Sequence, residues 1–116
     1  MDRRDVRLAA EIQHAVMELI PYGLKDPRVE TVSVTSVQVT HDLKLAKIHI
    51  DVPGDAVTRQ RALRALRNAR GYLRRELAAQ VTVRQVPDLA FYLDMSRENQ
   101  RRVETLLDEI HFKKTS

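Results

Sequence analysis

The residues best suited to chemistry in this sequence are a run of arginines in its middle. Residues 56–86 contain eight arginines and a single acid, Glu76, so this segment carries a net charge of +7 while the whole chain carries +4. Arginine forks match phosphate oxygens and stack on nucleobases. A basic segment in an otherwise nearly neutral chain is typical of a protein that binds a polyanion. The arginines are Arg59, Arg61, Arg64, Arg67, Arg70, Arg74, Arg75 and Arg84.

A solvated helix face is the alternative explanation for these arginines. The chain has 15 arginines and 5 lysines, so the choice of arginine over lysine is partly compositional. Composition does not explain the missing acids, because 15 of the 16 acidic residues lie outside the segment. The segment therefore favours polyanion binding. The predicted RNA-binding residues are Arg61, Arg64, Arg67, Arg70, Gly71, Arg74, Arg75 and Arg84.

Gly71 stands inside this basic run, where an exposed glycine costs on the order of 1 kcal/mol relative to alanine in a helix. If residues 61–77 form one helix, the arginines lie on one side and the apolar residues on the other. Gly71 either breaks the helix and lets a ligand backbone approach, or it is a simple kink between packed helices. A break would expose a helix N-terminus, which attracts phosphate. The apolar side would consist of Ala62, Ala65, Leu66, Ala69, Tyr72 and Leu73.

Other reactive residue types do not form a recognisable catalytic or metal site. The chain has no cysteine, its four histidines lack metal-ligand spacing, and neither a P-loop nor a nucleophile elbow is present. Asp26, Asp42, Asp88 and Asp94 stand beside turn signals, which predicts turn or capping roles. With few aromatics, we expect no broad base-stacking platform, and Tyr72 is assigned to the core. We predict a protein that is not an enzyme and needs no cofactor or metal.

Length and composition predict one soluble domain. The chain has 116 residues, 43% of them hydrophobic and 31% charged, which is typical of a globular protein. The N-terminus lacks the apolar stretch of a signal peptide, and no apolar run approaches the ~20 residues of a membrane span. The absence of cysteine fits a reducing compartment. We expect a cytoplasmic protein with a single domain at 1–112 and a short basic tail at 113–116.

The hydrophobic periodicity predicts seven elements, and helices packed on one face of a three-stranded sheet are the simplest arrangement. The first helix spans residues 3–20, and Pro21 and Gly23 mark its end. Asp2 or Asp5 either caps it or stabilises its first turn. Its predicted apolar side is Val6, Ala9, Ala10, Val16, Met17 and Ile20. The other elements are strands in 30–40, 44–52 and 81–86, helices from a cap at Asp55 or Thr58 to 68 and over 71–80, and a last helix capped by Ser96.

Two strand details carry specific expectations. The alternation in 30–40 changes phase at Thr35–Ser36, which predicts a β-bulge there. The first two strands should form an antiparallel hairpin across a tight turn at 40–43. The third strand is interrupted by Pro87, and residues 89–93 extend it if the proline lies at an edge or a bulge.

Four stretches together resemble the bacterial ribosome-binding factor A family. They are "DPRV" at 26–29, "VTHDLKLAKI" at 39–48, "LRNARGYLRREL" at 66–77 and "VRQVPDLAFYLDMS" at 83–96. Thr40 is a mild departure, because the family usually has serine there. The resemblance implies an α+β, KH-like fold of type II with the order α-β-β-α-α-β-α. It also implies that Ala69-Arg70-Gly71 forms the family's Ala-x-Gly kink in place of the usual GxxG loop.

The resemblance further implies a non-enzymatic factor for late maturation of the small (30S) ribosomal subunit. Its partners would be the 30S subunit and 16S ribosomal RNA, with assembly GTPases left open. It would act as a monomer, especially in the cold, and leave before translation. Independently of the resemblance, the charge favours RNA or another polyanion. Two further hypotheses stay open: a protein-interaction module with a solvated arginine face, and, more weakly, a helix that binds anionic membranes.

Overall fold

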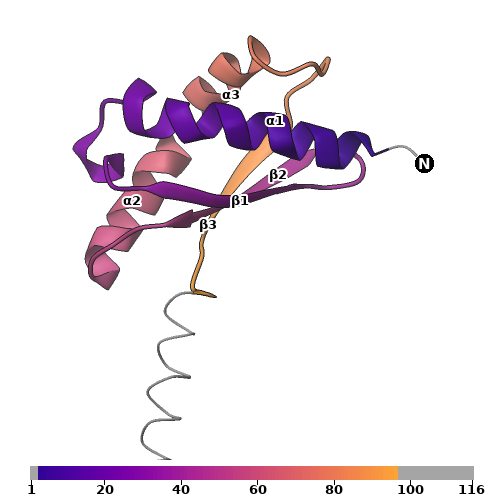
Figure 1. Cartoon of the computed structure of the whole chain (residues 1–116). Coiled ribbons are helices and arrows are strands. Elements are labelled where there is room, and N and C mark those ends of the chain that lie inside the picture. Colours follow the sequence, from indigo (N-terminus) through magenta and orange to yellow (C-terminus); the bar gives the residue numbers. More distant parts are fainter. Residues whose placement is uncertain (1–2, 97–116) are drawn as a thin grey trace, which may run out of the picture.

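Three helices cover one face of a three-stranded sheet in the computed structural model, which describes residues 3–96 (Figure 1). The elements are α1 (Arg4–Glu18), η1 (Leu19–Gly23), η2 (Pro27–Val29), β1 (Ser33–Val39), β2 (Leu45–Asp51), α2 (Ala56–Asn68), α3 (Arg70–Ala78) and β3 (Asp88–Leu93). The sheet order is β1-β2-β3, with β1 antiparallel and β3 parallel to β2. The predicted α+β class is confirmed. The predicted last helix and the 113–116 tail lie outside the described residues.

The β1–β2 hairpin carries the predicted bulge. Val34 pairs with Ile50, but Ser36 pairs with His49, so Thr35 is the extra residue on β1. The Thr35 hydroxyl donates to the carbonyl of His49 at 3.2 Å. A bulge resets which side chains face the core, and this explains the change of phase in the sequence.

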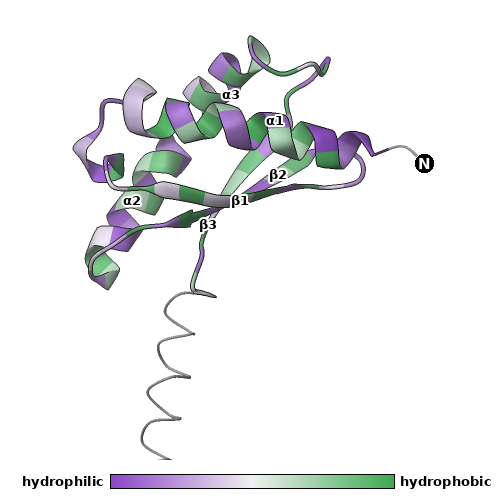
Figure 2. Cartoon of the chain, viewed as in Figure 1, coloured by the Kyte–Doolittle hydropathy of each residue, from purple (hydrophilic) through white to green (hydrophobic). Residues whose placement is uncertain are grey.

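Strand β2 shows most directly that the sheet is covered on one face. Ala46, Ile48 and Ile50 are fully buried, whereas Lys47 and His49 between them are partly exposed. Hydrophobic and hydrophilic residues alternate along this part of the chain, as Figure 2 shows. Side chains alternate across a strand, so the even-numbered residues face the helices and the odd-numbered ones face away.

The core joins the sheet to all three helices. Phe91 of β3 is opposite Ile48 of β2 and is 2% exposed. Leu66 of α2 and both Leu73 and Leu77 of α3 are completely buried. Each fully buried side chain of this size stabilises the fold by roughly 1.5–3 kcal/mol relative to an exposed one. The helices that carry the arginines are therefore fixed to the sheet by their apolar sides.

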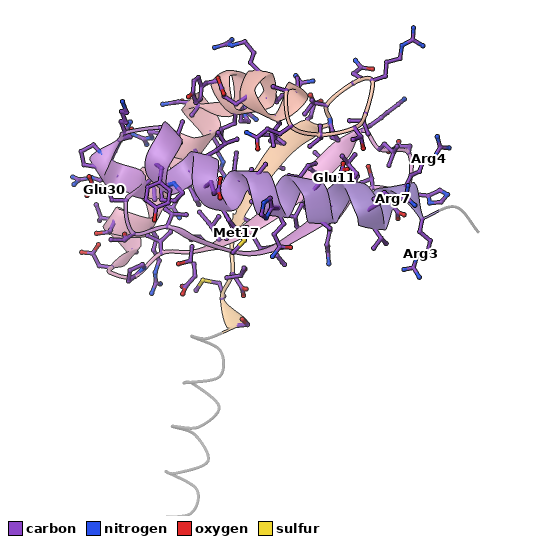
Figure 3. All side chains as sticks on the ribbon, turned by 45° about the horizontal axis from the view of Figure 1, so that its top comes forward. Arg3, Arg4, Arg7, Glu11, Met17 and Glu30 are labelled. Atoms are coloured by element: carbon purple, nitrogen blue, oxygen red, sulfur yellow. The ribbon has the colours of Figure 1, made fainter. Side chains whose placement is uncertain are left out.

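The predicted apolar side of α1 was partly wrong. Val6 and Met17 are about half exposed, at 50% and 52%, and Met17 is labelled in Figure 3. The helix instead buries Leu8, Ile12 and Ala15, together with Val16 as predicted. Leu8, Ile12 and Ala15 follow one stripe at 3.6 residues per turn, while Val6 and Met17 lie on its far side. Asp5 lies in the first turn, which is one of the two predicted roles, and Asp2 lies outside the described residues. The residue before the helix is Arg3, and no side-chain hydrogen bond of a described residue caps the helix.

The end of α1 also differs from the prediction. The α-helix stops at Glu18, and the chain continues as a single wider π-helical turn over Leu19–Gly23. The Leu24 amide closes this turn on the Leu19 carbonyl at 3.2 Å. Pro21 has no amide hydrogen to donate to the preceding turn, and a π turn accommodates that missing bond.

The predicted third strand at 81–86 was wrong. Residues 79–87 form a loop, and β3 begins only at Asp88, where it pairs with Leu45. The β-branched Val81 and Val86 are buried in the core without joining the ladder. The β-branched side chains of this segment therefore reflect burial and not strand pairing. Pro87 separates the segment from the strand because it cannot donate a ladder hydrogen bond.

We expect an acid-sensitive contribution to stability where β3 ends. The amide of Ser96 donates to Asp94 at 3.0 Å, and hydrogen bonds from Ser96 are the largest cause that lowers the Asp94 pKa from 3.8 to about 2. A depressed carboxyl pKa stabilises the fold above pH 3.8, and this contribution is lost as the pH falls through about 2. Asp94→Asn should therefore lower the midpoint of urea unfolding at pH 6, and by clearly less at pH 2. A difference of the same size at both pH values would contradict this assignment.

Candidate nucleic-acid interface

Helix α2 presents its arginines to solvent because its opposite side is held in the core. Asp55 caps the helix as predicted, accepting the Thr58 amide at 2.8 Å. Alanine and leucine residues at 62, 63, 65 and 66 are buried. Arg61, Arg64 and Arg67 are exposed, and their three-residue spacing places them in one row.

The helical conformation is interrupted at Ala69, between α2 and α3. Ala69 has φ −90° and ψ 4°, outside the helical range, so α2 ends at Asn68 and α3 starts at Arg70. The Arg70 Nε donates to the Arg67 carbonyl at 3.0 Å, which brings these two arginines together across the break. Two helices meeting in this stretch confirm the predicted break in the basic run. We name the exposed residues Arg61, Arg64, Arg67, Arg70 and Arg75 the arginine surface.

Gly71 was proposed to break the helix through a backbone conformation that other residues resist, and it does not adopt such a conformation. It lies inside α3, and its φ is not in the left-handed region. A Cβ built at Gly71 would meet only Nη1 of Arg75, at an ordinary 3.9 Å. Ala69 therefore forms the kink, and Gly71 leaves open space beside the first turn of α3.

Gly71→Ala is expected to raise the free energy of unfolding by about 0.5–1 kcal/mol, because alanine is the better helix former and fits without a clash. Chemical denaturation measures this directly. If the variant is stable but binds RNA more weakly, the weaker binding indicates that the RNA backbone closely approaches Gly71. A clear loss of stability would show that the space beside Gly71 is occupied in solution.

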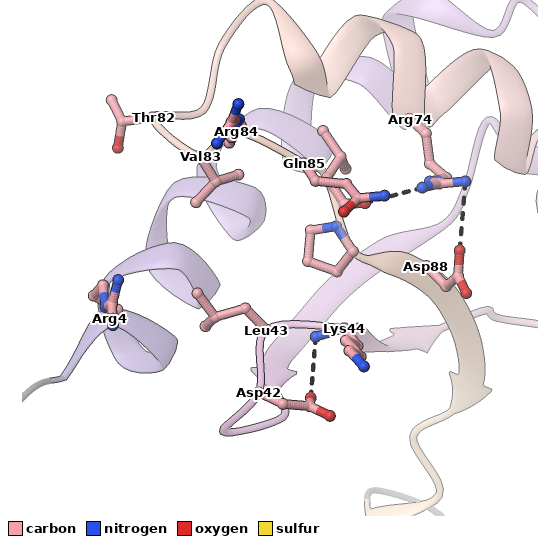
Figure 4. Close-up of a pocket in the computed structure, with 12 residues that line it drawn as sticks. Arg4, Asp42, Leu43, Lys44, Arg74, Thr82, Val83, Arg84, Gln85 and Asp88 are labelled. Atoms are coloured by element: carbon pink, nitrogen blue, oxygen red, sulfur yellow. Dashed lines mark hydrogen bonds and ion pairs between the residues drawn. The ribbon is translucent and has the colours of Figure 1, made fainter.

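Arg74 and Arg84 lie apart from the arginine surface. Both line a pocket formed with the β1–β2 turn and the start of α1 (Figure 4). The Arg74 side chain makes contacts within the fold. Its guanidinium donates to the Val86 carbonyl at 2.9 Å and lies 3.4 Å from the Asp88 carboxylate. The Arg74 side chain is therefore held by the 79–87 loop and the start of β3.

Arg74→Ala should destabilise the protein, whereas Arg75→Ala, one position along the same helix, should not. Loss of the bond to Val86 is expected to cost roughly 1 kcal/mol, and the solvent-exposed ion pair adds little. Thermal unfolding of the two variants checks the contrast. Equal stability of both variants would show that the 79–87 loop does not depend on Arg74.

Tyr22 and Tyr72 are both accessible to solvent. Tyr22 is 78% exposed. Tyr72 is 37% exposed, so its predicted place in the core was wrong. The prediction treated residues 61–77 as one continuous helix, and the break at Ala69 changes the direction in which Tyr72 faces. A Cβ on Gly23 would lie 3.8 Å from the Tyr72 hydroxyl, so this tyrosine packs near the end of α1.

The aspartates act as turn and cap residues. Asp26 accepts the Arg28 amide at 2.9 Å, and hydrogen bonds from Arg28 lower its pKa. Asp42 accepts the Thr40 hydroxyl at 2.7 Å and the Lys44 amide at 3.1 Å, and these bonds lower its pKa. Asp88 differs, since it pairs with Arg74. Among residues 3–96 no group of three or more His, Cys, Asp or Glu is placed to hold a metal ion.

Comparison with known proteins identifies the family. The model of the family described as "Ribosome-binding factor A" matches residues 4–107. The chain belongs to the ribosome-binding factor A family. A ribosome-binding factor A of Syntrophomonas wolfei is 39% identical over 110 residues, covering 93% of this chain and 90% of that protein. One of Desulforamulus reducens is 40% identical over 111 residues, covering 96% and 92%.

Solved structures of ribosome-binding factor A share the fold. The crystal structure of the Thermus thermophilus protein matches with a TM-score of 0.70 and 29% identity, covering 77% of this chain and 93% of that one. A second match, with a TM-score of 0.65, 29% identity and the same coverage, is a homology model of the Thermus thermophilus protein fitted into a cryo-EM map of a 30S complex. The stretches that indicated the family at 39–48 and 66–77 cover the hairpin turn and the α2–α3 break.

Sequence reasoning missed part of the charged surface of this family member. Arg4 and Lys44 join Arg84 in the pocket, although they belong to segments with ordinary local charge. No local pattern brings such distant residues together, so only the fold reveals the grouping. None of the described helices is both long and apolar enough to cross a lipid bilayer.

Proposed function

We propose that this protein binds the small (30S) ribosomal subunit late in its assembly, through contacts with 16S ribosomal RNA, and catalyses no reaction. The observation that carries this proposal is family membership over most of the chain, including a relative whose model was fitted into a map of a 30S complex. The exposed arginines of α2 and α3 supply the chemistry that such binding needs.

The arginine surface suits contacts with an RNA backbone. Within residues 3–96 its side chains form no ion pair, so their charge is available to phosphates. Arginine binds phosphate in a two-pronged geometry, and RNA-binding proteins commonly position themselves by such backbone contacts. Neither a GxxG loop nor a row of aromatics is present along α2 and α3. The proposed mode is therefore recognition of RNA shape and charge rather than sequence.

We infer the timing and partners of the proposed activity from the resemblance to the family. The protein acts as a monomer on a late precursor, supports assembly especially in the cold, and leaves before translation begins. Release then requires a change in the particle that removes the RNA geometry contacted by the arginine surface. Assembly GTPases are the class of partner that could drive such a change.

Fractionation of ribosomal particles tests the proposal most simply. A cell lysate is separated on a sucrose gradient, and the protein is detected across the free, small-subunit, large-subunit and translating fractions. We expect enrichment with small-subunit particles that contain unprocessed 16S RNA, increasing after a shift to low temperature. Finding the protein only free or with large subunits would overturn the proposal.

A salt titration separates RNA binding from the protein-interaction alternative. Contacts with RNA phosphates make log K fall linearly with log salt, by roughly 0.7 to 0.9 for each contact. We expect the purified protein to bind a fragment of 16S RNA at low salt and to follow this dependence. No RNA binding at low salt would instead favour a protein partner for the helices.

A further inference from the structure

A basic pocket opens where the start of α1, the β1–β2 turn and the 79–87 loop meet (Figure 4). Its volume is about 560 Å³, within the range of small-ligand sites and sufficient for one nucleotide. We call this cavity the basic pocket. Cations and apolar side chains both line it, among them Arg4, Leu43, Lys44, Val83, Arg84 and Pro87.

The walls of the basic pocket are held in place from three sides. Thr82 donates its hydroxyl to Glu11 of α1 at 2.9 Å, which ties one end of the loop to the helix. Arg74 holds the other end through the Val86 carbonyl. The Asp88 amide donates to the Lys44 carbonyl at 2.9 Å, joining loop and turn. A cavity fixed in this way exists before any ligand arrives, so binding does not have to order it.

Positive charge in the basic pocket exceeds negative charge. Four cations and two acids line it, and both acids already have partners. Asp42 accepts bonds from Thr40 and Lys44 within the turn, and Asp88 pairs with Arg74. The Lys44 and Arg84 side chains form no hydrogen bond or ion pair within residues 3–96. In Figure 4 Asp42 lies beside Lys44, on the side of the turn opposite Val83 and Arg84. An anion can therefore meet Arg84 without facing this carboxylate, whereas the Lys44 charge also attracts Asp42 and helps to lower its pKa.

Apolar side chains also line the basic pocket, and one of them belongs to a residue in an unfavourable backbone conformation. Leu43 has φ +63°, a left-handed value that costs a residue with a side chain roughly 1–2 kcal/mol. Glycine or asparagine would fit this turn with less strain. The leucine side chain is only partly buried, and its remaining surface lines the pocket beside Val83 and Pro87. Apolar side chains next to cations match a nucleobase joined to a phosphate.

We infer that the basic pocket receives a single unpaired RNA nucleotide, with its base against Leu43 and Val83 and its phosphates near Lys44 and Arg84. This inference rests on the proposed function, and it names a second contact besides the arginine surface. Helix α3 connects the two, because Arg70 and Arg75 belong to the arginine surface while Arg74 lines the pocket. RNA running along α3 would place a bulged base within reach of the pocket, and unpaired bases are the parts of RNA that proteins can splay out.

The test uses the full chain and two fluorescent RNA duplexes that are identical except for one bulged nucleotide. Fluorescence anisotropy measures both dissociation constants at one salt concentration. We expect the wild type to prefer the bulged duplex by about fivefold or more, because only that duplex offers a base to bury. Lys44→Glu/Arg84→Glu should remove the preference. Leu43→Asn should reduce it, and because asparagine tolerates a positive φ, the turn is kept.

Arg3→Glu/Arg7→Glu is the matched control, since it makes the same change in charge at exposed positions outside the pocket (Figure 3). This control variant should bind both duplexes slightly more weakly than the wild type and keep the preference for the bulged duplex. Equal affinity of the wild type for both duplexes would overturn the inference, even if small-subunit binding is found and the proposed function stands. Loss of preference in the control as well would also overturn it. If a glutamate-rich peptide binds the wild type but not the pocket variant, and duplex preference is absent, the pocket belongs to a protein partner instead.

Discussion

Replacing Arg61, Arg64 and Arg70 by glutamate is expected to weaken binding to the small ribosomal subunit by roughly a hundredfold or more. Arg61 and Arg64 form no hydrogen bond or ion pair within residues 3–96, and Arg70 bonds only the neighbouring Arg67 carbonyl. The fold should therefore survive the change while three phosphate contacts become repulsive. Sedimentation of the purified variant with isolated 30S particles measures the loss.

A second triple variant controls for the general effect of charge. Arg3, Arg7 and Lys25 are exposed and lie outside α2 and α3. Their replacement by glutamate changes the net charge of the protein by the same amount. We expect this control to bind within a few-fold of the wild type at moderate salt, because distant charges are screened. If both triple variants lose binding equally, overall charge and not the arginine surface attracts the particle.

Phe91→Ala is expected to lower the free energy of unfolding by about 3–5 kcal/mol. Phe91 is 2% exposed, and it fills the space between the sheet and the helices that carry the arginines. Its removal leaves a cavity under α2 and α3 that neighbouring side chains can fill only in part. Such a loss approaches the whole stability of a small domain, so binding should fail together with folding.

Tyr92→Ala provides the comparison for Phe91, one position along the same strand. Tyr92 is 44% exposed and stacks on His49 at 5.6 Å between ring centroids. Its loss removes a cross-strand pair worth roughly 0.2–1 kcal/mol. Urea denaturation followed by circular dichroism compares the two variants. Similar destabilisation by both would contradict the assignment of Phe91 to the core.

The sequence predicted those features that depend on neighbouring residues. The bulge at Thr35 follows from a change in alternation along one strand, and the cap at Asp55 needs only the Thr58 amide three residues away. The helical break within the basic run was also found, because a glycine among strong helix formers is a local signal. Its position was displaced, since Ala69 and not Gly71 leaves the helical conformation.

Features that depend on tertiary packing were less accessible to sequence reasoning. Val81 and Val86 have high β-propensity, but they serve the core from a loop, because propensity does not separate burial from strand pairing. Tyr72 was wrongly assigned to the core, because the assignment treated residues 61–77 as one helix and no sequence pattern fixes the angle between two helices. The basic pocket draws on four separate segments, so Arg4 and Lys44 could not be grouped with Arg84 before the fold was known.

The salt dependence of binding to isolated 30S precursors tests most directly whether the arginine surface contacts ribosomal RNA. Dissociation constants are measured over a series of salt concentrations for the wild type, the Arg61/Arg64/Arg70 triple variant and its charge-matched control. If these arginines contact phosphates, the slope of log K against log salt should fall by about two units in the triple variant and remain unchanged in the control. Equal slopes for all three proteins would contradict the account.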